Sequence, residues 1–160
     1  MEIVNVKIGV IMNKTIILGP PCVGKTTLAY IALKHKIPSF STHQSNLYSI
    51  NRKELVTYII NLDISLFLDA GGVDIYSFNH QYKNKGFGIR TVLLLPPKDV
   101  YLERERIEIE RYKKRNQNGT FHYDEFKDKK SEFDLVIEDV LSPQEIFNYI
   151  KEWNDDGKLM

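Results

Sequence analysis

The chain has 160 residues, the size of a single domain, and its 42% hydrophobic and 11% aromatic content excludes a mainly disordered protein. The 22 Lys and Arg residues nearly balance the 21 Asp and Glu residues. The net charge of +1 therefore excludes a strong positive electrostatic field over the whole chain that would attract nucleic acid or anionic membranes. The single cysteine, Cys22, excludes an internal disulfide, and no apolar run reaches the roughly 18 residues that span a bilayer. Because residues 1–12 also lack a signal-peptide pattern, we expect a cytoplasmic protein.

The first part of the chain alternates short apolar runs with helical patterns. Thr15–Gly19 is apolar and rich in β-branched residues, and it ends in Gly-Pro-Pro, which predicts a buried parallel strand. A helix is predicted over Lys25–Lys36 and a short strand over Ile37–Thr42. A capping-box pattern at Asn51 then predicts a second helix that ends at about Leu62.

The same alternation continues to the end of the chain. Ile64–Asp69 is an apolar run that predicts a third buried strand, and two glycines follow it. The remaining expected elements are a helix over Val73–Lys85, a strand over Ile89–Leu95, a charged helix capped by Asp99 and reaching about Arg115, a polar loop over Asn116–Thr120, a strand over Phe133–Glu138, and a last helix whose capping box begins at Ser142.

Five apolar strands separated by helices predict an α/β fold with a parallel sheet, because none of the connections is a tight hairpin turn. Helices are expected on both faces of this sheet, and residues 1–160 are expected to form one domain. Residues 1–11 allow two interpretations. They are either an extension ahead of a natural start at Met12 or an extra edge strand from Ile3 to Ile11.

The strongest motif lies between the first predicted strand and the first predicted helix. Gly19–Thr26 (GPPCVGKT) fits the pattern G-x-x-x-x-G-K-[ST] without a departure. Its glycines let backbone amides point toward phosphate oxygens, and the helix that follows adds the positive end of its dipole. The segment therefore predicts a nucleoside triphosphate site rather than an ordinary glycine-rich turn. The expected binding residues are Gly19, Pro20, Pro21, Cys22, Val23, Gly24, Lys25, Thr26 and Thr27.

Three side chains in and near this loop are expected to carry chemistry. Lys25 would neutralise the β- and γ-phosphates, and the hydroxyl of Thr26 would ligate Mg²⁺. Asp69 ends the third predicted strand, and a carboxylate at the carboxyl end of a strand beside a phosphate loop can hold Mg²⁺. The alternative for Asp69 is a turn or helix cap. Cys22 is expected to fill space in the loop, with a redox switch as the alternative.

The motif GPPCVGKTT and the order of strands and helices resemble the small P-loop kinases, the group that contains nucleoside monophosphate kinases and shikimate kinase. The resemblance runs from Met12 onward and implies a three-layer P-loop NTPase fold with sheet order 2-3-1-4-5. It implies ATP and Mg²⁺ as cofactors and a mobile lid at about residues 104–126. Its lid arginines, which neutralise the transferred phosphoryl group, would be Arg104, Arg111 and Arg115. The alternative is that each arginine lies on a solvated helix face and pairs with neighbouring glutamates.

The side that would bind the acceptor departs from known patterns of this group. Asp69-Ala70-Gly71-Gly72-Val73 lacks the arginine that grips the acceptor phosphate in adenylate kinase-like enzymes, although Gly71-Gly72 is closer to the glycine run of shikimate kinase. Ser41-Thr42-His43-Gln44 stands where shikimate kinase carries Asp-x-Asp. The candidates for acceptor contacts are therefore His43, Gly71, Gly72 and Asp74.

The resemblance implies an ATP- and Mg²⁺-dependent kinase that transfers the γ-phosphoryl group to a small-molecule or nucleotide acceptor. Two alternatives stay open. One is a nucleotide-binding ATPase or switch protein without acceptor chemistry, although no Asn-Lys-x-Asp guanine motif follows the fourth predicted strand. The other is a polynucleotide 5′-hydroxyl kinase, which the basic residues from Arg111 to Arg115 would serve. A nucleic acid partner is not favoured, a membrane partner is not expected, and the oligomeric state stays open.

Overall fold

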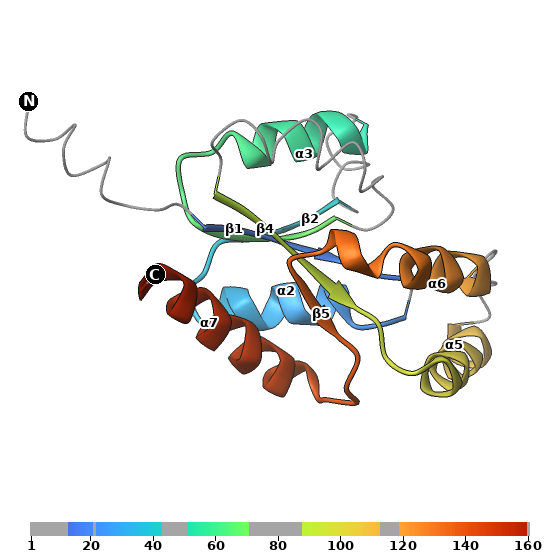
Figure 1. The fold of residues 1–160 in the computed structure, drawn as a ribbon. Coiled ribbons are helices and arrows are strands. Elements are labelled where there is room, and N and C mark those ends of the chain that lie inside the picture. Colours follow the sequence, from blue (N-terminus) through green and yellow to red (C-terminus); the bar gives the residue numbers. More distant parts are fainter. Residues whose placement is uncertain (1–12, 21, 43–50, 71–87, 113–118, 160) are drawn as a thin grey trace, which may run out of the picture.

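The computed structural model describes residues 13–20, 22–42, 51–70, 88–112 and 119–159. In this part of the chain five strands form one parallel sheet in the order β2-β3-β1-β4-β5, which confirms the predicted fold and sheet order (Figure 1). The elements are β1 (Asn13–Leu18), α2 (Lys25–Lys34), β2 (Ser39–Ser41), α3 (Arg52–Ile60), β3 (Leu66–Asp69), β4 (Gly88–Leu94), α5 (Lys98–Tyr112), α6 (Gly119–Asp128), a 3₁₀ turn (Lys130–Glu132), β5 (Leu135–Ile137) and α7 (Pro143–Leu159).

The sheet forms the middle of three layers. Figure 1 shows α3 on one face of the sheet and α2 and α7 on the other, with α5 and α6 beside the carboxyl ends of the strands. The central strand β1 buries Ile16, Ile17 and Leu18 completely, as expected for a parallel strand covered on both faces. Phe147 of α7 is also fully buried and packs against Phe67 of β3, so this helix closes one face of the core.

Two helices begin with the capping boxes that the sequence predicts. The Asn51 side chain accepts a hydrogen bond from the backbone N–H of Glu54 at 2.8 Å. At the start of α7, Ser142 Oγ accepts from the Glu145 N–H at 3.2 Å, and Glu145 Oε1 accepts from the Ser142 N–H at 3.1 Å. These bonds satisfy amides that have no partner within the helix. The hydrogen bonds from Ser142 also lower the pKa of Glu145.

Near its C-terminal end, helix α7 contacts the strands β1 and β4 through side chains. The guanidinium of Arg90 in β4 lies 3.8 Å from the ring centroid of Trp153 and donates to Asn154 Oδ1 at 3.2 Å. Asn154 Nδ2 in turn donates to Thr15 Oγ1 of β1 at 3.0 Å. A cation–π contact and two side-chain hydrogen bonds therefore join the last helix to the two central strands.

Two expectations about the helices were wrong. Helix α5 begins at Lys98, so Asp99 lies inside its first turn rather than at its cap, where its charge still favours the helix dipole. A loop was predicted over Asn116–Thr120, but Gly119 and Thr120 belong to α6, which spans Gly119–Asp128. In α3, Tyr58 is 68% exposed, whereas Val56 is buried.

Helix α6 is stabilised by contacts with residues that are distant in sequence. Tyr123 is buried, its ring stacks on that of Tyr101 in α5 at 5.0 Å, and its hydroxyl donates to the carbonyl of Pro96 at 2.7 Å. The expected helix over residues 73–85 and the expected loop at residues 116–118 lie outside the described residues. Among the described helices, none combines the length and apolarity that a bilayer crossing needs.

Candidate nucleotide-binding site

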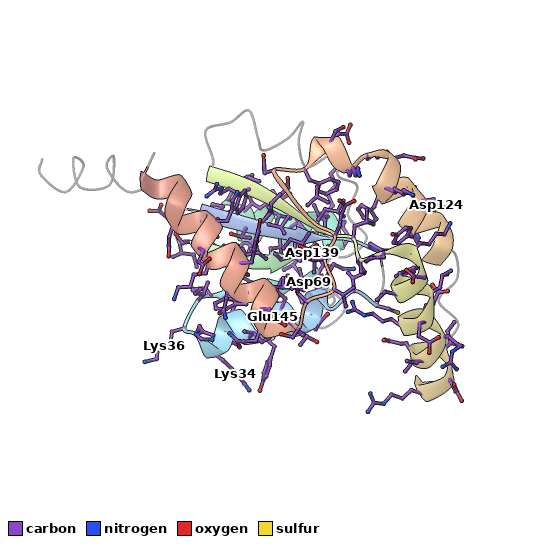
Figure 2. The ribbon with its side chains drawn as sticks, turned by 60° about the horizontal axis from the view of Figure 1, so that its bottom comes forward. Lys34, Lys36, Asp69, Asp124, Asp139 and Glu145 are labelled. Carbon is purple, nitrogen blue, oxygen red and sulfur yellow. The ribbon has the colours of Figure 1, made fainter. Side chains whose placement is uncertain are left out.

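The ends of three elements meet where the sequence predicts the phosphate loop. Asp69 ends β3 and pairs in register with Ile17 of β1 on one side and Ser41 of β2 on the other. Thr26, in the first turn of α2, donates a hydrogen bond from Oγ1 to Asp69 Oδ2 at 2.9 Å. Asp69 is fully buried, and Figure 2 shows it in the interior of the molecule. The two residues expected to serve Mg²⁺ are thus brought into direct contact.

The loop backbone is turned at three positions with positive φ. These are Gly19 at 152°, Cys22 at 68° and Gly24 at 93°. Cys22 adopts a left-handed conformation that costs a non-glycine residue about 1–2 kcal/mol. Gly24 is the N-cap of α2 and contributes no capping side chain, so amides of the first turn stay available to an anion.

Replacing Gly19 with alanine is expected to destabilise the protein far more than the same change at Gly24. A Cβ at Gly19 would lie 2.7 Å from the backbone oxygen of Leu94 and 3.1 Å from Val23 Cγ2, whereas a Cβ at Gly24 meets nothing within 4 Å. Strain and overpacking together predict a loss of roughly 3–5 kcal/mol in the free energy of unfolding for Gly19→Ala. Backbone strain alone predicts about 1–2 kcal/mol for Gly24→Ala. Urea unfolding of both variants measures the difference, and equal losses would contradict this account.

Lys25 lies within the curve of its own loop. Its ammonium donates to the carbonyl of Gly19 at 2.8 Å and to that of Pro20 at 2.7 Å. Burial lowers the pKa of Lys25 to about 8, and the nearby charges of Asp69 and Cys22 oppose this effect. The ammonium group is therefore held next to the amides of the loop, where phosphate oxygens would accept its hydrogen bonds.

A pocket of about 170 Å³ adjoins the loop. Three elements distant in sequence contribute its walls: the phosphate loop with the start of α2, helix α5, and the segment that leads into α7. Its lining is mostly apolar, with one guanidinium, that of Arg104. The lining residues are Cys22, Val23, Gly24, Leu28, Arg104, Leu141, Pro143 and Ile146. An apolar pocket beside a phosphate loop can hold the base of a nucleotide, which a guanidinium can also stack on.

Comparison with protein-family models and with curated protein sequences finds no match. Among solved structures, shikimate kinase from Aquifex aeolicus has a TM-score of 0.66 at 16% identity, over 91% of this chain and 98% of that one. Shikimate kinase from Acinetobacter baumannii in complex with shikimate has a TM-score of 0.68 at 17% identity, over 95% and 97%. Dephospho-CoA kinase from Campylobacter jejuni has a TM-score of 0.51 at 14% identity, over 91% and 100%.

The chain has the fold of the small P-loop kinases. At these identities the likeness is one of fold, and it confirms the resemblance from which the sheet order was expected. In this P-loop kinase fold the phosphate loop follows β1, and Asp69 lies on the neighbouring strand β3. The residues expected to carry chemistry thus occupy the carboxyl edge of the sheet, where ligands bind in open α/β sheets.

The expected lid arginines differ in their surroundings. Arg104 lines the pocket beside the phosphate loop, while Arg111 is exposed further along α5. Arg106 of the same helix forms ion pairs with Glu103 at 2.7 Å and Glu110 at 2.9 Å. It therefore has the surroundings that the alternative interpretation gave to the arginines, a solvated helix face with glutamate partners. Pro21, His43, Gly71, Gly72, Asp74 and Arg115 lie outside the described residues.

Sequence reasoning missed two contributors to the site. Ser41 Oγ donates to Asp69 Oδ2 at 3.2 Å, from the end of β2. Pro143 and Leu141 reach the pocket from the segment before α7. The position of Ser41 at the end of a predicted strand was a usable signal, but its contact depends on the pairing of β2 with β3. The expected sheet order placed these two strands side by side, but it did not give the register that pairs Ser41 with Asp69.

Proposed function

We propose that the chain is an ATP- and Mg²⁺-dependent kinase that transfers the γ-phosphoryl group to a small-molecule or nucleotide acceptor. The observation that carries this proposal is the contact between Thr26 and the buried Asp69, directly beside the phosphate loop and Lys25. An ordinary glycine-rich turn gives no reason to bury a carboxylate at this position. The fold shared with shikimate kinase and dephospho-CoA kinase supports the same conclusion.

Binding of the nucleotide would rest on the loop and on the adjoining pocket. Backbone N–H groups of the loop and of the first turn of α2 would surround the phosphates, although Pro20 and Pro21 have no N–H to donate. Lys25 would exchange its two carbonyl contacts for phosphate oxygens. The base would enter the pocket between its apolar walls and the guanidinium of Arg104. Such positioning, with charge neutralisation, supplies most of the catalysis in phosphoryl transfer.

The residues beside the loop fit a magnesium ion. Thr26 Oγ1 and the carboxylate of Asp69 are hard oxygen donors, and Mg²⁺ commonly binds through one or two carboxylates together with substrate phosphates. When bound, the ion would neutralise charge on the β- and γ-phosphates. Within the described ranges no group of three or more His, Cys, Asp or Glu could hold a metal ion. Nucleotide phosphates and water would supply the other ligands of the proposed ion.

For the acceptor, a small hydroxyl-bearing molecule is our first choice. The structural relatives include a shikimate kinase in complex with shikimate and a dephospho-CoA kinase, both named for small-molecule substrates. Acceptor contacts would come from His43, Gly71, Gly72 and Asp74, and Arg104, Arg111 and Arg115 would neutralise the transferred phosphoryl group. A nucleotide-binding ATPase or switch without an acceptor and a polynucleotide 5′-hydroxyl kinase are the competing functions.

The test is phosphoryl transfer from γ-labelled ATP with Mg²⁺ to a panel of acceptors. The panel holds polyols related to shikimate, nucleosides, nucleotides and 5′-hydroxyl oligonucleotides, and the Lys25→Ala variant serves as the blank. Label that moves to one acceptor, and not in the blank, would establish a kinase and its acceptor class. Tight ATP binding with no labelled acceptor would count against the kinase proposal and favour a nucleotide-binding switch.

A further inference from the structure

We propose that Ser41 is a positioning residue that holds the carboxylate of Asp69 in the orientation needed for metal binding. This inference rests on the proposed function, because it assigns Ser41 to the same magnesium-nucleotide site. In the sequence, Ser41 belongs to a segment without an acidic residue, Ser41-Thr42-His43-Gln44. The structure brings its hydroxyl to the carboxylate that was expected to serve the metal.

Two hydroxyl groups from different elements donate to one oxygen of Asp69. Thr26 Oγ1 lies 2.9 Å from Asp69 Oδ2 and comes from the first turn of α2. Ser41 Oγ lies 3.2 Å from the same oxygen and comes from the end of β2. A carboxylate oxygen can accept two such bonds, and two donors on different elements restrict the rotation of the carboxylate. Ser41 therefore contributes to fixing the orientation of Asp69.

This arrangement also constrains the hydroxyl that would ligate the metal. A hydroxyl has one proton and two lone pairs, so when Thr26 donates its proton to Asp69 its lone pairs stay available to a cation. Asp69 thus orients Thr26, and Ser41 holds Asp69 from the other side. Residues that orient the ligands of a metal in this way typically change metal affinity or activity by about 10–100-fold when they are removed.

The chemistry of Ser41 suits the burial of its partner. Asp69 is fully buried, and a second carboxylate at position 41 would place two like charges on paired residues of neighbouring strands. A hydroxyl donates a hydrogen bond to Asp69 and adds no charge. Ser39 provides a comparison within the same strand. Its hydroxyl donates to the carbonyl of Ile37 at 3.1 Å, so it is bound within its own segment.

The test compares Ser41→Val with Ser41→Thr, two side chains of nearly equal volume that differ in the hydroxyl group. Ser41→Ala and Ser39→Ala complete the set. The first measurement is the affinity for a fluorescent ATP analogue with Mg²⁺ and, separately, with EDTA. For Ser41→Val and Ser41→Ala we expect the gain in affinity from Mg²⁺ to fall by about tenfold, with little change in EDTA. Ser41→Thr should regain most of the loss, and Ser39→Ala should match the wild type.

The second measurement is the Mg²⁺ dependence of phosphoryl transfer, in which the Mg²⁺ concentration for half-maximal rate should rise about tenfold in the variants that lack the hydroxyl. An unchanged response to Mg²⁺ in Ser41→Val, or equal effects in Ser39→Ala and Ser41→Ala, would overturn the assignment. The binding assay needs no acceptor. If no acceptor is phosphorylated, the proposed kinase function fails, while the effect of Mg²⁺ on nucleotide binding still decides the role of Ser41.

Discussion

Replacing Lys25 with alanine is expected to slow phosphoryl transfer by about 10²–10³-fold, because loss of one preorganised group at developing charge typically costs that much. The structure adds a reason for a large effect, since the Lys25 ammonium is held inside the phosphate loop by the carbonyls of Gly19 and Pro20. Lys34→Ala is the matched control. Lys34 lies in the last turn of the same helix, 4.9 Å from the Tyr30 ring centroid, and points outward in Figure 2. Initial rates with labelled ATP measure both, and similar rates would contradict the role of Lys25.

The pH dependence of the nucleotide affinity provides a second test of the role of Lys25. Its pKa is lowered to about 8 by burial, so the side chain is charged below pH 8 and loses its proton as the pH rises through that value. Bound phosphates favour the charged form, so above pH 8 nucleotide binding requires uptake of a proton. The affinity should then fall by up to about tenfold per pH unit. Lys25→Ala should remove this decline. Cys22→Ser should keep it, which excludes the neighbouring thiol as its source.

Phe147→Ala is expected to cause the largest loss of stability, about 3–5 kcal/mol in the free energy of unfolding. Phe147 is fully buried, its ring lies 4.6 Å from that of His35 on α2, and it tilts against Phe67 of β3 at 5.9 Å. Its removal would open a cavity where two helices and the sheet meet. For a chain of this size the melting temperature should fall by roughly 6–20 °C.

Tyr149→Ala is the control for this change, since Tyr149 lies on the same helix and is 50% exposed. We expect it to change the free energy of unfolding by no more than about 0.5 kcal/mol. Thermal unfolding followed by circular dichroism measures both variants. A loss for Phe147→Ala within 1 kcal/mol of that for Tyr149→Ala would contradict its place in the core.

The phosphate loop and the strands were predictable because their signals are local. Gly19 to Thr26 carry their glycines, lysine and threonine in one continuous motif, and the apolar runs before and after it have the lengths of strands. Asp69 was found for the same reason, as the polar residue at the end of an apolar run. The capping patterns at Asn51 and Ser142 span four residues each, and in the structure each of these side chains caps its helix.

The contacts that local signals do not encode were missed. Ser41 meets Asp69 only because β2 pairs with β3, and that register is set by packing across 28 residues of sequence. Arg104 and Arg106 are both arginines on one helix, but the rotation of α5 turns the first toward the pocket and leaves the second with glutamates. Helix α6 buries Tyr123 against Tyr101 of α5 and the carbonyl of Pro96, and the sequence of α6 alone does not reveal these contacts.

The link between Thr15 and Asn154 bears on how the chain folds during synthesis. The two residues are 139 positions apart, yet one hydrogen bond joins them, and Asn154 also binds Arg90 of β4. The strand that leads into the phosphate loop therefore leaves the ribosome long before its partner in α7 exists. Contacts of such separation slow folding, because a long loop must close before they form. The candidate nucleotide site would thus gain its full support only when α7 docks. If the proposed function holds, a nascent chain lacking that helix should bind nucleotide poorly.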